Sequence, residues 1–121
     1  MAESERRRIA GTPLHHIPWS AIVSLLPSTI EQVPMGLQGV YLVRYRDNPT
    51  KMNPASILCV ASALYCIRSR LSADYSGRGN PFLPDFIQAN PKDIYFQYVQ
   101  CDDPKNAAVY LVRALGYPIC N

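Results

Sequence analysis

The sequence lacks several features that would assign it to a particular class of protein. No apolar run approaches the length of about 20 residues that an α-helix needs to cross a bilayer. Arg6-Arg7-Arg8 is followed by Ile-Ala-Gly-Thr-Pro and not by the apolar core of a signal peptide. There is no internal repeat and no low-complexity tract. We therefore expect a soluble intracellular protein without a membrane partner, and the cytoplasm, the nucleoid and the nucleus are equally open as locations.

Charged side chains are also few. They make up 17% of the 121 residues and leave a net charge of +3, which permits nucleic-acid binding but does not by itself indicate it. The four cysteines, Cys59, Cys66, Cys101 and Cys120, lack the close paired spacing of a zinc site. Most of them lie in apolar runs, which is typical of small buried side chains in a reducing compartment. We expect no metal bound by cysteine and no disulfide-linked partner.

Hydrophobic residues are plentiful, at 48% of the chain, and one packed core fits this length. Eleven prolines interrupt the chain too often for a helical bundle or a coiled coil. The sequence therefore predicts one domain of short elements. Residues 1–18, which are polar and rich in arginine, are expected to form a flexible basic tail, and residues 19–121 to form the domain.

Hydrophobic periodicity predicts an α+β order of elements. Strands are expected over 39–46, 56–61 and 93–100, and the first two suit an antiparallel hairpin. Helices are expected over 19–26, 62–71, 81–90 and 103–115. Ser62 is the predicted N-cap of the second helix, and Asp103 that of the last, with Pro104 at its first position. These elements predict a small three-stranded antiparallel sheet flanked by helices.

Two triplets lie on the neighbouring predicted strands, and an arginine lies on the helix that follows. The first triplet is Gly39-Val40-Tyr41, the second is Cys59-Val60-Ala61, and the arginine is Arg70. This order resembles the GIY-YIG endonuclease family, in which Gly-Ile-Tyr and Tyr-Ile-Gly triplets precede a helix with an arginine. The resemblance covers about residues 19–118 and extends through Asn80-Pro81-Phe82-Leu83 to the third strand.

The resemblance implies a DNA-cutting site of which only part remains. In the family, the tyrosines position or deprotonate the attacking water, the arginine holds the phosphate, and a glutamate on the last helix binds a divalent metal. Tyr41 and Arg70 match the first tyrosine and the arginine. Cys59 replaces the second tyrosine, Ala61 replaces the glycine, and no acid stands near Ala108, where the glutamate is expected. Because a metal stabilises the transition state by several kcal/mol, the resemblance implies an impaired enzyme that holds no cofactor.

Two other uses of these residues stay open or are excluded. Asp102 and Asp103 are weak candidates for a substitute metal ligand, and with them the chain would be an active endonuclease that uses Mg²⁺ or Mn²⁺. The simpler interpretation is that Asp103 caps the last helix. Cys59 is not expected to act as a nucleophile, because no histidine lies in the ordered pattern to activate it.

Arginines near the predicted phosphate site favour retained binding of a nucleic-acid backbone. The predicted path consists of Arg68, Arg70, Arg78, Arg6, Arg7 and Arg8. Arg44 and Arg46 point to the strand face opposite Tyr41 and are interpreted as solvated strand-end charges. The leading hypothesis is a catalytically impaired, nuclease-like domain that binds nucleic acid or a protein partner. A protein-only assembly or interaction module is the alternative from a different class.

Overall fold

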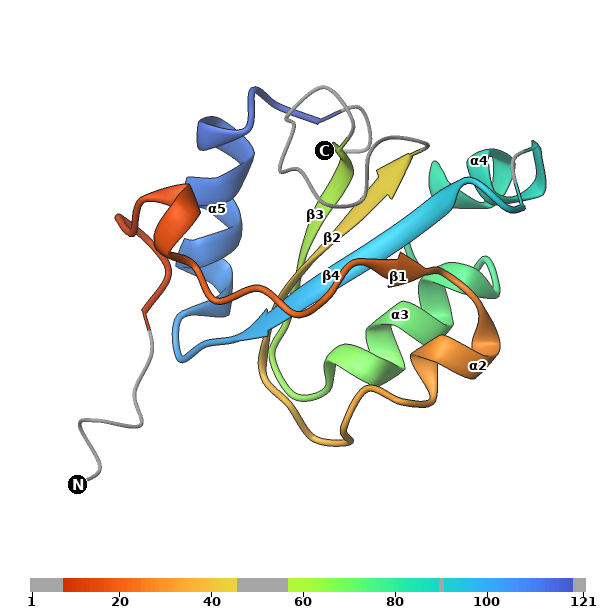
Figure 1. The fold of residues 1–121 in the computed structure, drawn as a ribbon, viewed down its shortest axis with the longest axis horizontal. Helices are drawn as coiled ribbons and strands as arrows, with labels where there is room; N and C mark the ends of the chain where they lie inside the picture. The colour runs from red at the N-terminus through yellow and green to blue at the C-terminus, as the bar shows by residue number, and fades with distance from the viewer. Residues whose placement is uncertain (1–7, 46–56, 90, 119–121) are drawn as a thin grey trace.

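The computed structural model describes residues 8–45, 57–89 and 91–118. A four-stranded antiparallel sheet of order β1-β4-β2-β3 lies between α5 on one face and α2, α3 and α4 on the other (Figure 1). The elements are η1 (Leu14–His16), β1 (Val23–Ser24), α2 (Pro27–Ile30), β2 (Gly39–Tyr45), β3 (Ile57–Ala63), α3 (Ile67–Tyr75), α4 (Leu83–Ala89), β4 (Ile94–Gln100) and α5 (Pro104–Ala114). None of the helices in these ranges is long and apolar enough to cross a membrane.

The central strand β2 separates two hydrophobic clusters. Tyr41 and Val43 point toward α3, while Val40 and Leu42 point toward α5, as the period-2 geometry of a strand requires. Gly39 begins β2 where the backbone of β4 comes close: a Cβ at this position would lie 2.1 Å from the carbonyl oxygen of Val99. The glycine of the first triplet is therefore required for packing of the sheet.

Strand β3 forms one edge of the sheet and carries an irregularity. It pairs antiparallel with β2, as predicted, and Val43 lies opposite Cys59 while Arg44 lies opposite Ile57. Leu58 is the extra residue of this bulge and joins the cluster on the α3 side, together with Cys59. The bulge thus leaves Cys59, Ala61 and Ala63 on the α3 side of the edge strand.

The prediction of three strands and of a helix over 19–26 is wrong. Val23 pairs with Phe96, and the backbone N–H of Leu25 donates to the carbonyl of Ile94 at 2.9 Å, so this segment becomes β1, a fourth strand. The helical spacing of Trp19, Ile22, Val23 and Leu26 was misleading, because hydrogen bonds from β4 outweigh local periodicity. Helix formation starts only at Pro27, in the short α2.

The predicted start of the second helix at Ser62 is also wrong. Ser62 lies within β3, opposite Val40, and α3 begins at Ile67 with Cys66 as its N-cap residue. The N–H of Ile67 donates to the carbonyl of Leu37 at 2.8 Å. Pairing with β2 therefore extends the strand at the expense of the predicted helix. The other predicted strands and helices correspond to β2, β4, α4 and α5 with small shifts at their ends.

Asp103 precedes α5 as predicted, but its side chain does not cap the helix. The carboxylate accepts hydrogen bonds from the backbone N–H of Ile9 at 3.0 Å and of Ala10 at 3.1 Å. Ile9 is 1% exposed and packs in the cluster beneath α5, together with Ile17. Part of the segment predicted as a flexible tail, residues 8–18, is thus attached to the domain, whereas Arg6 and Arg7 lie outside the described residues.

The interpretation of Arg44 as a solvated charge is wrong, although its predicted strand face is correct. Arg44 is 2% exposed, and its Nη1 donates to Oε1 of the buried Gln97 at 2.8 Å. Burial of the guanidinium is tolerated because the head group has polar partners. Arg46 lies outside the described residues. Cys59 and Cys101 are buried, as predicted for small hydrophobic side chains, whereas Cys66 is half-buried.

Candidate functional site

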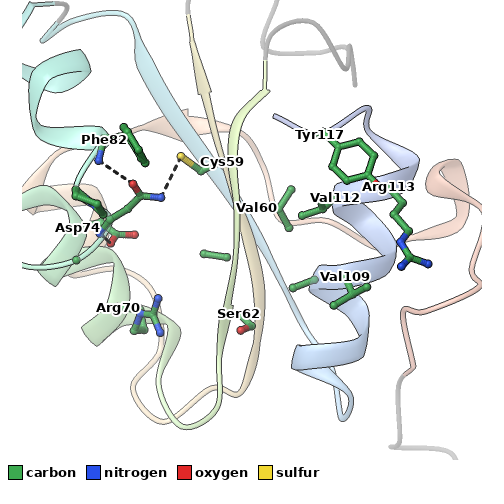
Figure 2. Close-up of a pocket in the computed structure, with 15 residues that line it drawn as sticks. Cys59, Val60, Ser62, Arg70, Asp74, Phe82, Val109, Val112, Arg113 and Tyr117 are labelled. Carbon is green, nitrogen blue, oxygen red and sulfur yellow. Dashed lines mark hydrogen bonds between the residues drawn. The ribbon is translucent and has the colours of Figure 1, made fainter. Parts of the chain in front are cut away.

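A pocket of about 660 Å³ runs along β3 at the edge of the sheet. Figure 2 shows side chains from α3 and the segment before α4 on one side of β3, and side chains from α5 on the other. The lining residues are Cys59, Val60, Ala61, Ser62, Arg70, Asp74, Gly79, Asn80, Pro81, Phe82, Ala108, Val109, Val112, Arg113 and Tyr117.

Four positions singled out in the sequence meet in this pocket. Cys59 and Ala61 come from β3, Arg70 from α3, and Ala108 from α5. They converge because α3 and α5 lie on opposite faces of the sheet and both reach the edge strand between them. Positions separated by up to 49 residues in the chain thus border one cavity.

Tyr41 does not line the pocket. Its side chain is 0% exposed, and its hydroxyl donates a hydrogen bond to Oδ2 of Asp74. Asp74 lies one helical turn after Arg70 on α3, is 1% exposed, and contributes to the pocket wall. Asp74 was not identified from the sequence, because the predicted helix ended at residue 71, whereas α3 extends to Tyr75. A helix extended to Tyr75 would have shown the Arg70–Asp74 spacing.

The second oxygen of Asp74 is also used. Oδ1 accepts a hydrogen bond from the backbone N–H of Asn80 at 2.9 Å. Gly79 lies so close that a Cβ there would come within 1.8 Å of this oxygen. The Asn80 side chain continues the contacts, since its Oδ1 accepts from the N–H of Phe82 at 2.9 Å and its Nδ2 donates to Sγ of Cys59 at 3.7 Å (Figure 2). These hydrogen bonds link Tyr41 in the core, through Asp74 and Asn80, to Cys59 in the pocket wall.

This environment keeps the proton on Tyr41. Burial raises the pKa of the Tyr41 phenol well above its ordinary value of 10.0, and the Asp74 carboxylate raises it further. Arg70 lowers the pKa of Tyr41, but its effect is smaller. The phenol therefore keeps its proton at neutral pH and donates it in the hydrogen bond to Asp74.

The donor atoms of the pocket do not fit the divalent metal that the GIY-YIG resemblance implies. Asp74 is the one carboxylate in the described lining, and both its oxygens accept hydrogen bonds. Mg²⁺ and Mn²⁺ bind through carboxylate oxygens that are available to the ion. Asp102 and Asp103 line a separate pocket with Arg8, Ala10 and Asn106 at the start of α5. Within residues 8–45, 57–89 and 91–118, no group of three His, Cys, Asp or Glu side chains is placed to hold a metal ion.

The arginines predicted to form one path fall into separate places. Arg70 lines the β3 pocket, whereas Arg68 and Arg78 line a pocket between α2 and α3. Two residues along an α-helix correspond to a rotation of about 200°, so Arg68 and Arg70 point to opposite sides of α3. Arg113 of α5 also lines the pocket and was missed. Its i, i+4 spacing from Val109, which also lines the pocket, is the signal that could have identified it.

The pocket combines positive charge with exposed apolar surface. Phe82, Val109 and Tyr117 border it with exposures of 59%, 54% and 67%. Arg70 and Arg113 are both exposed and lie on opposite sides of β3 (Figure 2). Such a surface suits a ligand with both anionic and flat apolar groups.

Comparisons with protein-family models, with curated proteins and with solved structures found no match to this chain.

Proposed function

We propose that this chain is a catalytically impaired GIY-YIG-like domain that binds nucleic acid along the β3 pocket without cutting it. The observation that carries the proposal is the meeting of Cys59, Ala61, Arg70 and Ala108 in one pocket, since these positions were assigned by resemblance alone. Gly39 and its close contact with β4 agree with a required glycine in the first triplet.

The charges of the pocket support binding of a phosphate backbone. Arg70 and Arg113 present two exposed guanidinium groups, and the one carboxylate of the described lining is buried and hydrogen-bonded. Arginine binds phosphate oxygens through paired N–H donors. The Arg70 and Arg113 side chains are therefore the groups expected to contact phosphates.

The chemistry of the same pocket supports loss of cutting. Hydrolysis of a phosphodiester requires a proton acceptor for the water and stabilisation of the negative charge that develops. Tyr41 is buried, protonated and hydrogen-bonded to Asp74. Cys59 is buried in place of a second tyrosine, and Ala108 provides no oxygen ligand. In the proposed function Arg70 and Arg113 still contact phosphate, whereas the described lining lacks the second tyrosine and the glutamate that the family uses on water and metal.

Cutting is tested by incubating the purified chain with supercoiled plasmid and either Mg²⁺ or Mn²⁺. We expect no nicked or linear product beyond that of a protein-free control. Arg70→Ala is tested in parallel, because a contaminating nuclease would be unaffected by this substitution. Metal-dependent cutting that Arg70→Ala abolishes would contradict the proposal and favour an active endonuclease.

Binding is tested by fluorescence anisotropy with labelled oligonucleotides between about 50 and about 200 mM salt. Arg70→Ala and Arg113→Ala should each weaken binding and make the salt dependence shallower by about 0.7 to 0.9 on a log–log plot. Arg68→Ala is the matched control on the other side of α3, and Lys105→Ala is the control on α5, since both remove one charge outside the pocket. Absence of binding at low salt would refute the proposal and favour a protein-only interaction module.

A further inference from the structure

Two exposed aromatic rings face the pocket from opposite walls. Phe82 precedes α4 and is 59% exposed, and Tyr117 follows α5 and is 67% exposed. Figure 2 shows them on either side of β3. Large aromatic side chains normally bury most of their surface, so rings left open beside a pocket indicate a surface that a ligand covers.

The backbone at Tyr117 is unusual. Its φ is +57°, in the left-handed region, directly after Gly116 with a φ of +78°. The N–H of Tyr117 donates to the carbonyl of Val112 at 2.8 Å, which closes the end of α5. Glycine adopts this conformation easily, but a bulky residue does so at a cost in free energy. The chain therefore keeps a strained tyrosine whose ring makes little contact with the core, a combination common at binding sites.

Each wall pairs one cation with one aromatic ring. Arg70 and Phe82 lie on the α3–α4 side of β3, and Arg113 and Tyr117 lie on the α5 side (Figure 2). Grooves that bind single-stranded nucleic acid combine these two elements, because arginine contacts the phosphates and the rings stack on unpaired bases. In a duplex the faces of the bases are covered by neighbouring base pairs, so the rings would lack partners.

We infer that the β3 pocket binds unpaired nucleotides, with bases stacked on Phe82 and Tyr117 and phosphates held by Arg70 and Arg113. The inference rests on the proposed function and names its substrate class as single-stranded nucleic acid. Val60, Val109 and Val112 add apolar surface to the pocket lining. Selectivity for a strand without base pairs follows from the rings, while the arginines contribute to the affinity for any nucleic acid.

The test compares a labelled oligonucleotide with the duplex formed by the same strand and its complement, at one salt concentration. The single strand should bind more tightly. Phe82→Ala and Tyr117→Ala should each weaken binding of the single strand by about tenfold, as expected for loss of one stacked base, and leave the duplex affinity unchanged. Tyr117→Phe, which keeps the ring, should bind like the parent chain. Tyr65→Ala is the matched control, because Tyr65 is 83% exposed and lies outside the pocket.

A further variant separates binding from folding. Tyr117→Gly removes the ring and also relieves the positive φ, so the free energy of unfolding should stay the same or rise while single-strand affinity falls. Equal affinity for single strand and duplex, reduced by Arg70→Ala but unaffected by Tyr117→Ala, would overturn the inference and leave the proposed function intact. Absence of binding to either nucleic acid would overturn both.

Discussion

At the scale of single residues, Tyr41 shows that a motif position does not by itself reveal what the side chain does in the structure. Tyr41 occupies the position of the first family tyrosine by resemblance, yet its hydroxyl is committed to Asp74 inside the core. Asp74, which no motif marked, is held by Tyr41 and Asn80 and connects β2 to the loop after α3. The Tyr41 hydroxyl thus has a structural role that is independent of any catalytic one, because it satisfies a buried carboxylate.

Tyr41→Phe should destabilise the fold by about 1–3 kcal/mol, because it leaves a buried acceptor without its donor. Urea unfolding monitored by circular dichroism measures this difference. Tyr110→Phe is the matched control: its hydroxyl donates to the backbone carbonyl of Thr12 at 2.5 Å in a partly exposed place. Its loss should cost only about 0.5–1.5 kcal/mol. If both variants lose the same free energy of unfolding, the buried Tyr41–Asp74 hydrogen bond stabilises the fold no more than a partly exposed one.

The same substitution should change the stability at alkaline pH. The pKa of Tyr41 in the folded chain lies above its ordinary value of 10.0. Above about pH 10 the unfolded chain therefore loses the Tyr41 proton more readily than the folded chain does. Its contribution to stability is complete below about pH 10 and is lost as the pH rises toward the folded-state pKa. The free energy of unfolding should therefore fall less steeply above pH 10 in Tyr41→Phe than in the parent chain. If the free energy of unfolding falls equally steeply above pH 10 in both chains, the raised pKa of Tyr41 is contradicted.

At the scale of elements, the sequence predicts best where local pattern and tertiary contacts agree. β2 and β3 were predicted with their pairing, because β-branched and aromatic residues fill both strands. β1 was not predicted, since a strand of two residues depends on β4 for its hydrogen bonds. The start of α3 was missed because Ser62 has the side chain of an N-cap but pairs with Val40.

In the candidate site too, some residues can be identified from local sequence pattern and others only from tertiary packing. Cys59, Ala61, Arg70 and Ala108, which the motif singles out in the sequence, line one pocket, whereas Tyr41 does not line it. Asp74 and Arg113 were missed, because their inclusion depends on the exact phase of α3 and α5 relative to the sheet edge. Helical phase relative to a neighbouring sheet is set by packing across the whole core, which one sequence does not display.

The attachment of the segment around Ile9 to the start of α5 can be tested directly. Asp103→Ala removes the acceptor for the N–H groups of Ile9 and Ala10 and should expose the segment before Thr12. We expect faster hydrogen exchange of these two amides and a loss of about 1.5–3 kcal/mol, the range for hydrogen bonds to a charged group.

Two substitutions control for other effects of that change. Asp103→Asn keeps an acceptor oxygen and should show an intermediate effect, and Asp85→Asn removes one negative charge from α4 without touching the segment. If the Ile9 amide stays protected in Asp103→Ala, burial of the Ile9 side chain, and not the carboxylate, holds the segment in place.

At the scale of the whole molecule, the pocket exists because two helical layers meet at one sheet edge. α3 and α5 lie on different faces of the sheet (Figure 1). Each contributes an arginine to the pocket beside β3. A net charge of +3 is small for a nucleic-acid-binding protein, so the proposed binding should depend on where the charges lie. A charge placed inside the pocket should therefore matter more than the same charge placed elsewhere.

Ala108→Glu introduces a carboxylate into the pocket that Arg70 and Arg113 also line, at the position where the family glutamate is expected. Oligonucleotide affinity should fall by about tenfold at low salt, equivalent to about 1.4 kcal/mol, through repulsion of phosphates and neutralisation of the arginines. The difference should shrink as salt screens these charges. Ala108→Gln controls for size, and Lys105→Ala makes the same change in net charge outside the pocket. An equal loss in Ala108→Glu and Lys105→Ala would mean that overall charge, and not the β3 pocket, determines binding.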